Sequence, residues 1–167
     1  MTVDALRLTD VVLRRDGTTI LDAINIGVRT DQRWIVIGAN GSGKTSLLRV
    51  MALYDHPTAG TVEVLGEQLG TTDVRRLRER VGYASAALAD QLRGDLTAHD
   101  VVKTARYAAL EPWWHTYTAA DNDRANECLA SLNVERHAER RFASLSSGEQ
   151  QRVLLARALM NLSLIHI

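Results

Sequence analysis

The sequence lacks several features that would restrict where the protein works. It has one cysteine, Cys128, among 167 residues, so no disulfide can form within the chain, which fits a reducing compartment. No apolar run is long enough to cross a bilayer, and the N-terminus lacks the basic and then apolar pattern of a signal peptide. We therefore expect a cytoplasmic protein that reaches the inner face of a membrane only through a partner.

An excess of charge of either sign is also missing. Twenty basic residues balance twenty acidic ones, so the net charge does not favour binding to nucleic acid or to an anionic membrane surface. Hydrophobic residues make up 46% of the chain and charged residues 24%, which is an ordinary composition for a soluble domain. The length favours one domain with its own core.

The order of sequence patterns predicts an α/β fold. Residues 5–14 and 18–28 are typical of two strands joined by a hairpin turn at Asp16-Gly17. Further short strands are predicted at 34–37, 61–65 and 81–83. The expected helices cover 45–53, 75–80, 97–110, 121–132 and the segment after Ser146.

The strongest motif is a glycine-rich loop between the predicted strand Trp34–Ile37 and the helix that follows. It reads Gly38-Ala39-Asn40-Gly41-Ser42-Gly43-Lys44-Thr45, followed by Ser46, and it fits the phosphate-binding P-loop pattern at every defined position. Glycines let successive backbone N–H groups turn inward toward phosphate oxygens, and the helix N-terminus adds partial positive charge. Lys44 would reach the β- and γ-phosphates of ATP, and the Thr45 hydroxyl would ligate Mg²⁺.

A second motif lies about a hundred residues later. Leu145-Ser146-Ser147-Gly148-Glu149-Gln150 precedes an amphipathic segment, and by itself it indicates a helix with Ser146 and Glu149 in a capping box. Together with the P-loop at this separation, it resembles the signature motif of ABC-type ATPases, which usually reads L-S-G-G-Q. The resemblance covers nearly the whole chain.

Membership of that family implies a fold and a mechanism. The fold would have an N-terminal antiparallel β-subdomain, an incomplete parallel core sheet and a helical subdomain at about 87–145. Two such domains would pair head to tail, as a homo- or heterodimer, around two ATP molecules. Ser146 and the backbone of Ser147 and Gly148 would contact the γ-phosphate held by the other domain. A membrane-spanning transporter subunit would be the further partner.

Two positions depart from the family pattern. Where most relatives have an aromatic residue that stacks on adenine, this chain has Arg15; its guanidinium could stack on a base or could be a solvated strand charge. Where the Q-loop glutamine is expected, this chain has Ala86, beside Ser85, and the next glutamine is Gln91. An altered Q-loop slightly favours the alternative function, a soluble ABC ATPase that acts in translation, on nucleic acid or in regulation.

The C-terminal residues differ from what the family leads one to expect. No acidic residue follows Glu149, so the Asp and Glu of Walker B and the later sensor histidine are missing, and we expect the chain alone to be poorly stable and not to turn over ATP. Residues 1–160 read as a partial nucleotide-binding domain. Residues 161–167, including His166, resemble translated adapter sequence and have no expected role.

Three lesser features have competing interpretations. Trp113-Trp114-His115 could dock a membrane subunit, although packing within the helical subdomain is favoured. The charged run Arg75–Arg80 is interpreted as a solvated helix face, with contact to nucleic acid as the lesser alternative. Cys128 is interpreted as a core residue, because no second cysteine or histidine cluster indicates a metal site. The sequence does not specify a transported substrate or a direction of transport.

Overall fold

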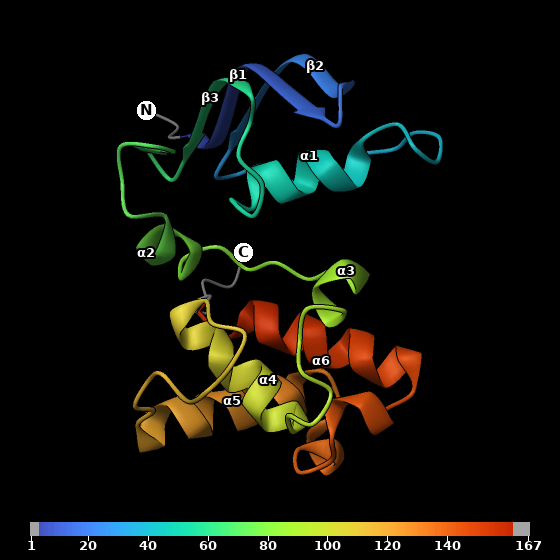
Figure 1. Cartoon of the computed structure of the whole chain (residues 1–167). Helices are drawn as coiled ribbons and strands as arrows, with labels where there is room; N and C mark the ends of the chain where they lie inside the picture. The colour runs from blue at the N-terminus through green and yellow to red at the C-terminus, as the bar shows by residue number, and fades with distance from the viewer. Residues whose placement is uncertain (1–3, 162–167) are drawn as a thin grey trace. The chain divides into compact units, whose positions relative to one another are not determined.

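The structure is a computed structural model that describes residues 4–161. The chain divides into two compact units, one that ends at Leu77 and one that begins at Arg78. Figure 1 shows the first unit in blue to green and the second in green to red. The boundary precedes the predicted helical subdomain at 87–145, which lies within the second unit together with the signature helix.

The first unit contains a four-stranded antiparallel sheet with strand order β2-β1-β3-β4. Its strands are β1 (Asp4–Arg15), β2 (Thr18–Arg29), β3 (Ala59–Val64) and β4 (Glu67–Gln68). The predicted hairpin is confirmed, because Asp16 and Gly17 join β1 to β2 with φ angles of +50° and +76°. Two residues with positive φ match the right-handed twist of the flanking strands. The antiparallel β-subdomain expected from the sequence is therefore present.

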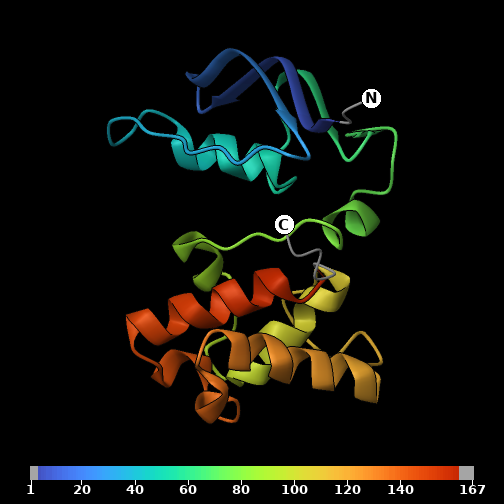
Figure 2. The same ribbon diagram turned by 180° about the vertical axis from the view of Figure 1, so that it is seen from behind.

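Helix α1 (Lys44–Met51) packs against this sheet, as Figures 1 and 2 both show. Leu47 and Val50 lie one helical turn apart and are buried, which places the apolar face of the helix on the strands. They share the core with Leu8, Val11, Leu53 and Val62. The P-loop, which leads directly into α1, is thus attached to a helix that the sheet holds in place.

An ion cluster joins the end of α1 to the hairpin. The Arg49 guanidinium donates two hydrogen bonds to the Asp55 carboxylate, at 2.9 and 2.8 Å, and Arg15 donates a third at 3.2 Å. The hydrogen bond from Arg49 is the main reason that the pKa of Asp55 is lowered. The bidentate geometry fixes the two guanidinium N–H groups against both carboxylate oxygens.

The predicted strands at Trp34–Ile37 and 81–83 are wrong. Residues 32–39 and 81–85 have no regular secondary structure, and Ile35 and Ile37 are 85% and 89% exposed. A strand forms only where a neighbour completes its backbone hydrogen bonds, and every strand pair within residues 4–161 is antiparallel and excludes these segments. The expected parallel core sheet is therefore not formed among the described residues.

Helices make up the second unit, after a short α2 (Val74–Arg78) at the division. They are α3 (Ala86–Ala89), α4 (Ala98–Lys103), α5 (Ala119–Ser131) and α6 (Ser147–Leu159), with 3₁₀ turns η1 (Thr104–Tyr107), η2 (Glu135–His137) and η3 (Phe142–Ser144). Helices α4, α5 and α6 pack on one another. The predicted helix at 97–110 has its Thr97 cap but ends earlier, where Lys103 gives way to η1.

A buried arginine on α6 organises this core. Arg157 is 3% exposed and donates hydrogen bonds to the Val101 carbonyl, the Thr104 hydroxyl and the Ala109 carbonyl, at 3.0, 2.8 and 2.7 Å. These bonds fix η1 and the turn after it against α6. On α5, the prediction that Cys128 lies on the packed face is confirmed, and burial raises the pKa of its thiol.

The tryptophans of the second unit lie on its surface. Trp113 is 56% exposed, with the Arg93 guanidinium 4.7 Å from its ring centre, and Trp114 is 82% exposed. The favoured interpretation, packing within the helical subdomain, is wrong for both tryptophans, whereas His115 stacks on Tyr107 with ring centres 4.3 Å apart.

In the part of the chain that the structure describes, no helix has the length and apolar character needed to cross a membrane.

Candidate functional site

The P-loop wraps around the side chain of its own lysine. The Lys44 ammonium donates hydrogen bonds to the carbonyl oxygens of Gly38 and Ala39, at 2.8 and 2.6 Å. Lys44 is also the first residue of α1, so its positive charge stands beside the positive end of the helix dipole. Both features favour an anion at this position.

Two glycines allow the loop to take this shape. Gly41 and Gly43 have φ angles of +81° and +87°, a region that L-residues rarely adopt. At Gly43 space is limiting as well, because a Cβ atom would lie 2.9 Å from the Ile20 carbonyl oxygen and 3.1 Å from a Leu21 methyl carbon. At Gly41 space is open, since a Cβ atom there would have no neighbour within 4 Å. The loop therefore passes directly over β2 at Gly43.

The loop residues line an open pocket of about 700 Å³ in the first unit. Its lining consists of Ile20, Asn40, Gly41, Gly43, Lys44, Thr45 and Ser46. The structure thus brings most of the predicted phosphate-binding residues together around one space. Ile20 is the lining residue that sequence analysis missed; its apolar side chain comes from β2, and its place beside Gly43 depends on tertiary packing.

The first turn of α1 is suited to a phosphate group. Within the described residues, no side chain caps this helix, and the first N–H groups of a helix have no partner inside the helix. Thr45 is exposed in this turn, and ligation of Mg²⁺ by its hydroxyl stays a prediction. Residues 4–161 contain no cluster of three His, Cys, Asp or Glu side chains that could hold a metal. Mg²⁺ that keeps several waters and binds phosphate oxygens fits such a site.

Arg15 lies at the end of β1, in the same unit as the P-loop. Its guanidinium bonds to Asp55, and its side chain is 55% exposed. The exposed part is available for contact with a flat ring, so stacking on adenine stays a prediction.

The signature residues form the start of α6 in the second unit. Leu145 is buried, whereas Ser146, Ser147 and Gly148 are exposed. The predicted capping box is confirmed: the Ser146 hydroxyl accepts from the Glu149 N–H, and the Glu149 carboxylate accepts from the Ser146 N–H at 2.8 Å and from its hydroxyl at 2.8 Å. The bonds from the Ser146 backbone and hydroxyl lower the pKa of Glu149.

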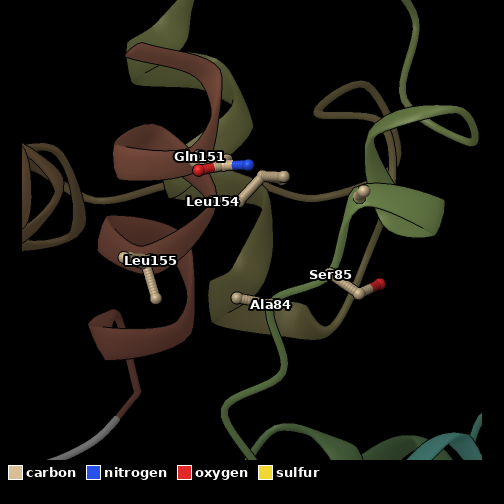
Figure 3. Close-up of a pocket in the computed structure, with 6 residues that line it drawn as sticks. Ala84, Ser85, Gln151, Leu154 and Leu155 are labelled. Atoms are coloured by element: carbon tan, nitrogen blue, oxygen red, sulfur yellow. The ribbon is translucent and has the colours of Figure 1, made fainter. Parts of the chain in front are cut away.

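The Q-loop position differs from the loop expected by family resemblance. Ala86 is the first residue of α3, and the Ser85 hydroxyl caps that helix by accepting from the Leu88 N–H at 3.1 Å. Ala84, Ser85 and Ala86 line an open pocket of about 490 Å³ with three residues of α6, Gln151, Leu154 and Leu155. Figure 3 shows this pocket between the two segments. A methyl group at Ala86 cannot ligate a metal ion or a water molecule.

Comparison with known proteins identifies the family. The family model described as "ABC transporter" matches residues 21–167. The ABC transporter ATP-binding protein YlmA of Bacillus subtilis is 37% identical over 156 residues, which are 93% of this chain and 59% of YlmA. The phosphonates import ATP-binding protein PhnC 1 of a Ruegeria species is 33% identical over 162 residues, or 93% of this chain and 62% of that protein.

Solved structures agree with the sequence comparison. The dimeric structure of MJ0796, a bacterial ABC transporter cassette, superposes with a TM-score of 0.79 at 26% identity, over 93% of this chain and 69% of that one. The same cassette is known bound to ADP and Pi, in a dimeric post-hydrolysis state. The chain spans about three fifths of the length of the curated relatives that it matches. The loop around Lys44, the capped motif at Ser146 and these matches together place the chain in the ABC transporter family.

Proposed function

We propose that this chain is the ATP-binding part of a transport complex and that it binds Mg-ATP at the P-loop. The observation that carries the proposal is the pocket at the start of α1, where Lys44, two glycines with positive φ and an uncapped helix N-terminus meet among the described residues. Each of these features favours phosphate. Thr45 supplies one oxygen to Mg²⁺, and the phosphates and water supply the others.

The second part of the proposal is a head-to-tail dimer. In such a dimer, Ser146, Ser147 and Gly148 of one protomer contact the γ-phosphate held on the P-loop of its partner. All three signature residues are exposed at the start of a helix, which is where an anion is favoured. The dimeric state of the MJ0796 cassette supports this arrangement. Closing and opening of the dimer would drive the attached machinery, and ATP hydrolysis would reset it.

The third part concerns the partner in the membrane. The name of PhnC 1 describes an import protein, and this supports transport over the soluble alternative. A membrane-spanning subunit would hold the chain at the cytoplasmic face. The exposed Trp113 and Trp114 are suited to such a contact, because aromatic side chains are enriched where protein surfaces meet.

Mixing two single-cysteine variants tests the dimer directly. Cys128 is buried and is replaced by alanine, which adds no polar group to the core, after which Ser42→Cys and Ser147→Cys are made in separate chains. In a head-to-tail dimer, residue 42 of one protomer faces residue 147 of its partner, so the mixture should form a disulfide-linked heterodimer only when ATP is added. The readout is a non-reducing gel.

Two controls give the experiment its meaning. Adding Lys44→Ala to both variants should prevent ATP from inducing the cross-link, because the phosphates lose their main cation. Each variant incubated alone should give little cross-link, since like positions do not meet in a head-to-tail pair. Cross-linking that is equal with and without ATP would contradict the proposed dimer.

A further inference from the structure

A hydrogen-bonded network surrounds the turn that carries the signature serine. The imidazole of His137, in η2, is 8% exposed, and its Nε2 lies 3.0 Å from the Glu149 Oε1 atom. Its Nδ1 lies 3.2 Å from Arg140 Nη1. Arg140 also donates from Nη2 to the Ser144 carbonyl at 2.9 Å. The network therefore connects residues on both sides of Ser146.

The contacts of the His137 ring determine which of its nitrogens carries the hydrogen. Arg140 can only donate and an ionised carboxylate can only accept, so the bonds at Nδ1 and at Nε2 both require the ring hydrogen on Nε2. That hydrogen can then point to the Glu149 carboxylate. Arg136 Nε also lies 3.0 Å from Nε2 and could donate to it only if the ring hydrogen were on Nδ1. With the hydrogen on Nε2, the bonds to Arg140 and to Glu149 both form, whereas with the hydrogen on Nδ1 only the bond from Arg136 forms.

The two oxygens of Glu149 have different partners. Oε2 accepts from the Ser146 N–H and from the Ser146 hydroxyl, each at 2.8 Å, whereas Oε1 faces His137. A serine hydroxyl has one hydrogen. While that hydrogen points to Glu149, it cannot be donated to a phosphate. The Ser146 hydroxyl must therefore turn away from Oε2 before it can donate to a phosphate oxygen.

We propose that His137 is a positioning residue for the signature motif. It holds the Glu149 carboxylate in place while Ser146 transfers its hydroxyl hydrogen bond from that carboxylate to the γ-phosphate. The carboxylate is held at Oε1 by His137 and at Oε2 by the Ser146 N–H. It therefore keeps α6 capped after the Ser146 hydroxyl has turned to the phosphate. The cations Arg136 and Arg140 beside the ring offset the negative charge that would otherwise repel the phosphate. The inference rests on the head-to-tail dimer of the proposed function.

Two amide substitutions separate this role from folding. Glutamine at position 137 can place an N–H near the position of Nε2, whereas the shorter asparagine reaches only the position of Nδ1. Both are polar and uncharged. His137→Gln should retain the bond to Glu149, and His137→Asn should lose it. His99→Asn is the matched control, because His99 belongs to the same unit and bonds to the Asn122 carbonyl, away from the motif.

The measurement is the dissociation constant of the ATP-bound dimer, by sedimentation, beside the affinity of the monomer for a fluorescent ATP analogue. We expect His137→Asn to weaken dimerisation about five- to tenfold, as the loss of one hydrogen bond that acts on Ser146 only through Glu149 implies. His137→Gln and His99→Asn should stay within about twofold. All variants should bind the analogue equally, since the P-loop is unchanged.

The outcomes distinguish the inference from the function on which it rests. If the unmodified protein binds the analogue but does not dimerise with ATP, the head-to-tail proposal is wrong, and this inference is lost with it. If it dimerises and His137→Asn dimerises equally well, only the positioning role of His137 is overturned. Equal weakening by His137→Asn and His99→Asn would also overturn that role, since it would indicate a general loss of stability.

Discussion

The two helices that carry the motifs begin in opposite ways. Helix α1 begins after Gly43, in the left-handed conformation, and its first turn contains no acidic residue and no side-chain cap within the described chain. Helix α6 begins after Ser146 and has a complete capping box with Glu149. The first helix has no anion of its own at its N-terminal N–H groups, whereas the second supplies one in Glu149.

This difference suggests a division of labour between the motifs. A P-loop without an internal anion has no carboxylate to displace when phosphate binds, and Lys44 has a third N–H besides the two that it donates to Gly38 and Ala39, so we expect it to hold the nucleotide in a single domain. The signature turn is already satisfied by Glu149, so contact with phosphate requires its serine to change partner. We infer that the first motif determines nucleotide affinity and that the second responds to the approach of a partner.

The largest effect should come from adding a methyl group to the P-loop. Gly43→Ala places a Cβ atom 2.9 Å from a backbone oxygen at a φ of +87°, and we expect it to lower the free energy of unfolding by about 3 kcal/mol. Gly41→Ala is the matched control, since its φ is similar but the space is open, and it should cost about 1 kcal/mol. Urea unfolding followed by circular dichroism measures both. Equal losses would show that steric contact with β2 is unimportant.

Removing the P-loop cation should have the next largest effect. Lys44→Ala deletes the ammonium that lies between Gly38, Ala39 and the start of α1. Loss of a charge-assisted bond to phosphate should reduce ATP affinity by about 2–3 kcal/mol, or roughly 30- to 150-fold. Isothermal titration calorimetry measures this. Lys103→Ala, which removes a lysine paired with Asp100 at 2.9 Å, should leave the affinity unchanged.

Residues with local signals were predicted well. The hairpin at Asp16-Gly17, the P-loop and the cap at Ser146 depend on neighbours within a few residues, and the structure contains all three. Ile20 and His137 were missed, because each acquires its role from contacts with a distant segment. Trp34–Ile37 was predicted as a strand from its apolar residues alone, and a strand also requires a pairing neighbour.

Deleting the cap of α6 should affect stability more than nucleotide binding. Ser146→Ala removes a hydroxyl that bonds to both the N–H and the carboxylate of Glu149, and we expect a loss of about 1 kcal/mol in unfolding free energy. The affinity of the monomer for ATP should not change, because the P-loop belongs to the other unit. Denaturant unfolding and calorimetry on the same variant test both statements. A fall in monomer affinity would contradict the division between the motifs.

The charge of Glu149 should make the same cap sensitive to pH. The pKa of Glu149 is lowered in the folded protein by the bonds from Ser146. The ionised carboxylate therefore stabilises the fold at pH values above 4.5, the ordinary pKa of a glutamate. That contribution is lost as the pH falls through the lower, folded pKa. Unfolding measured from pH 7 to pH 3 should therefore show Glu149→Gln less stable than the unmodified protein at pH 7, with the difference closing below about pH 4.5. A constant difference would indicate that the charge has no part in capping.

The smallest expected effect concerns the base of the nucleotide. If Arg15 stacks on adenine, Arg15→Ala should weaken ATP binding by about 0.5–1 kcal/mol, or roughly two- to fivefold, and leave the binding of inorganic tripolyphosphate unchanged. Arg14→Ala removes the same side chain at the neighbouring exposed position and should alter neither affinity.

The bond from Arg15 to Asp55 provides a competing explanation for weaker ATP binding, because its loss would disturb the end of α1 that Asp55 holds through Arg49. In that case Arg15→Ala would weaken ATP and tripolyphosphate equally, and adenine recognition would have to come from another residue of the pocket, with Ile20 the first to test.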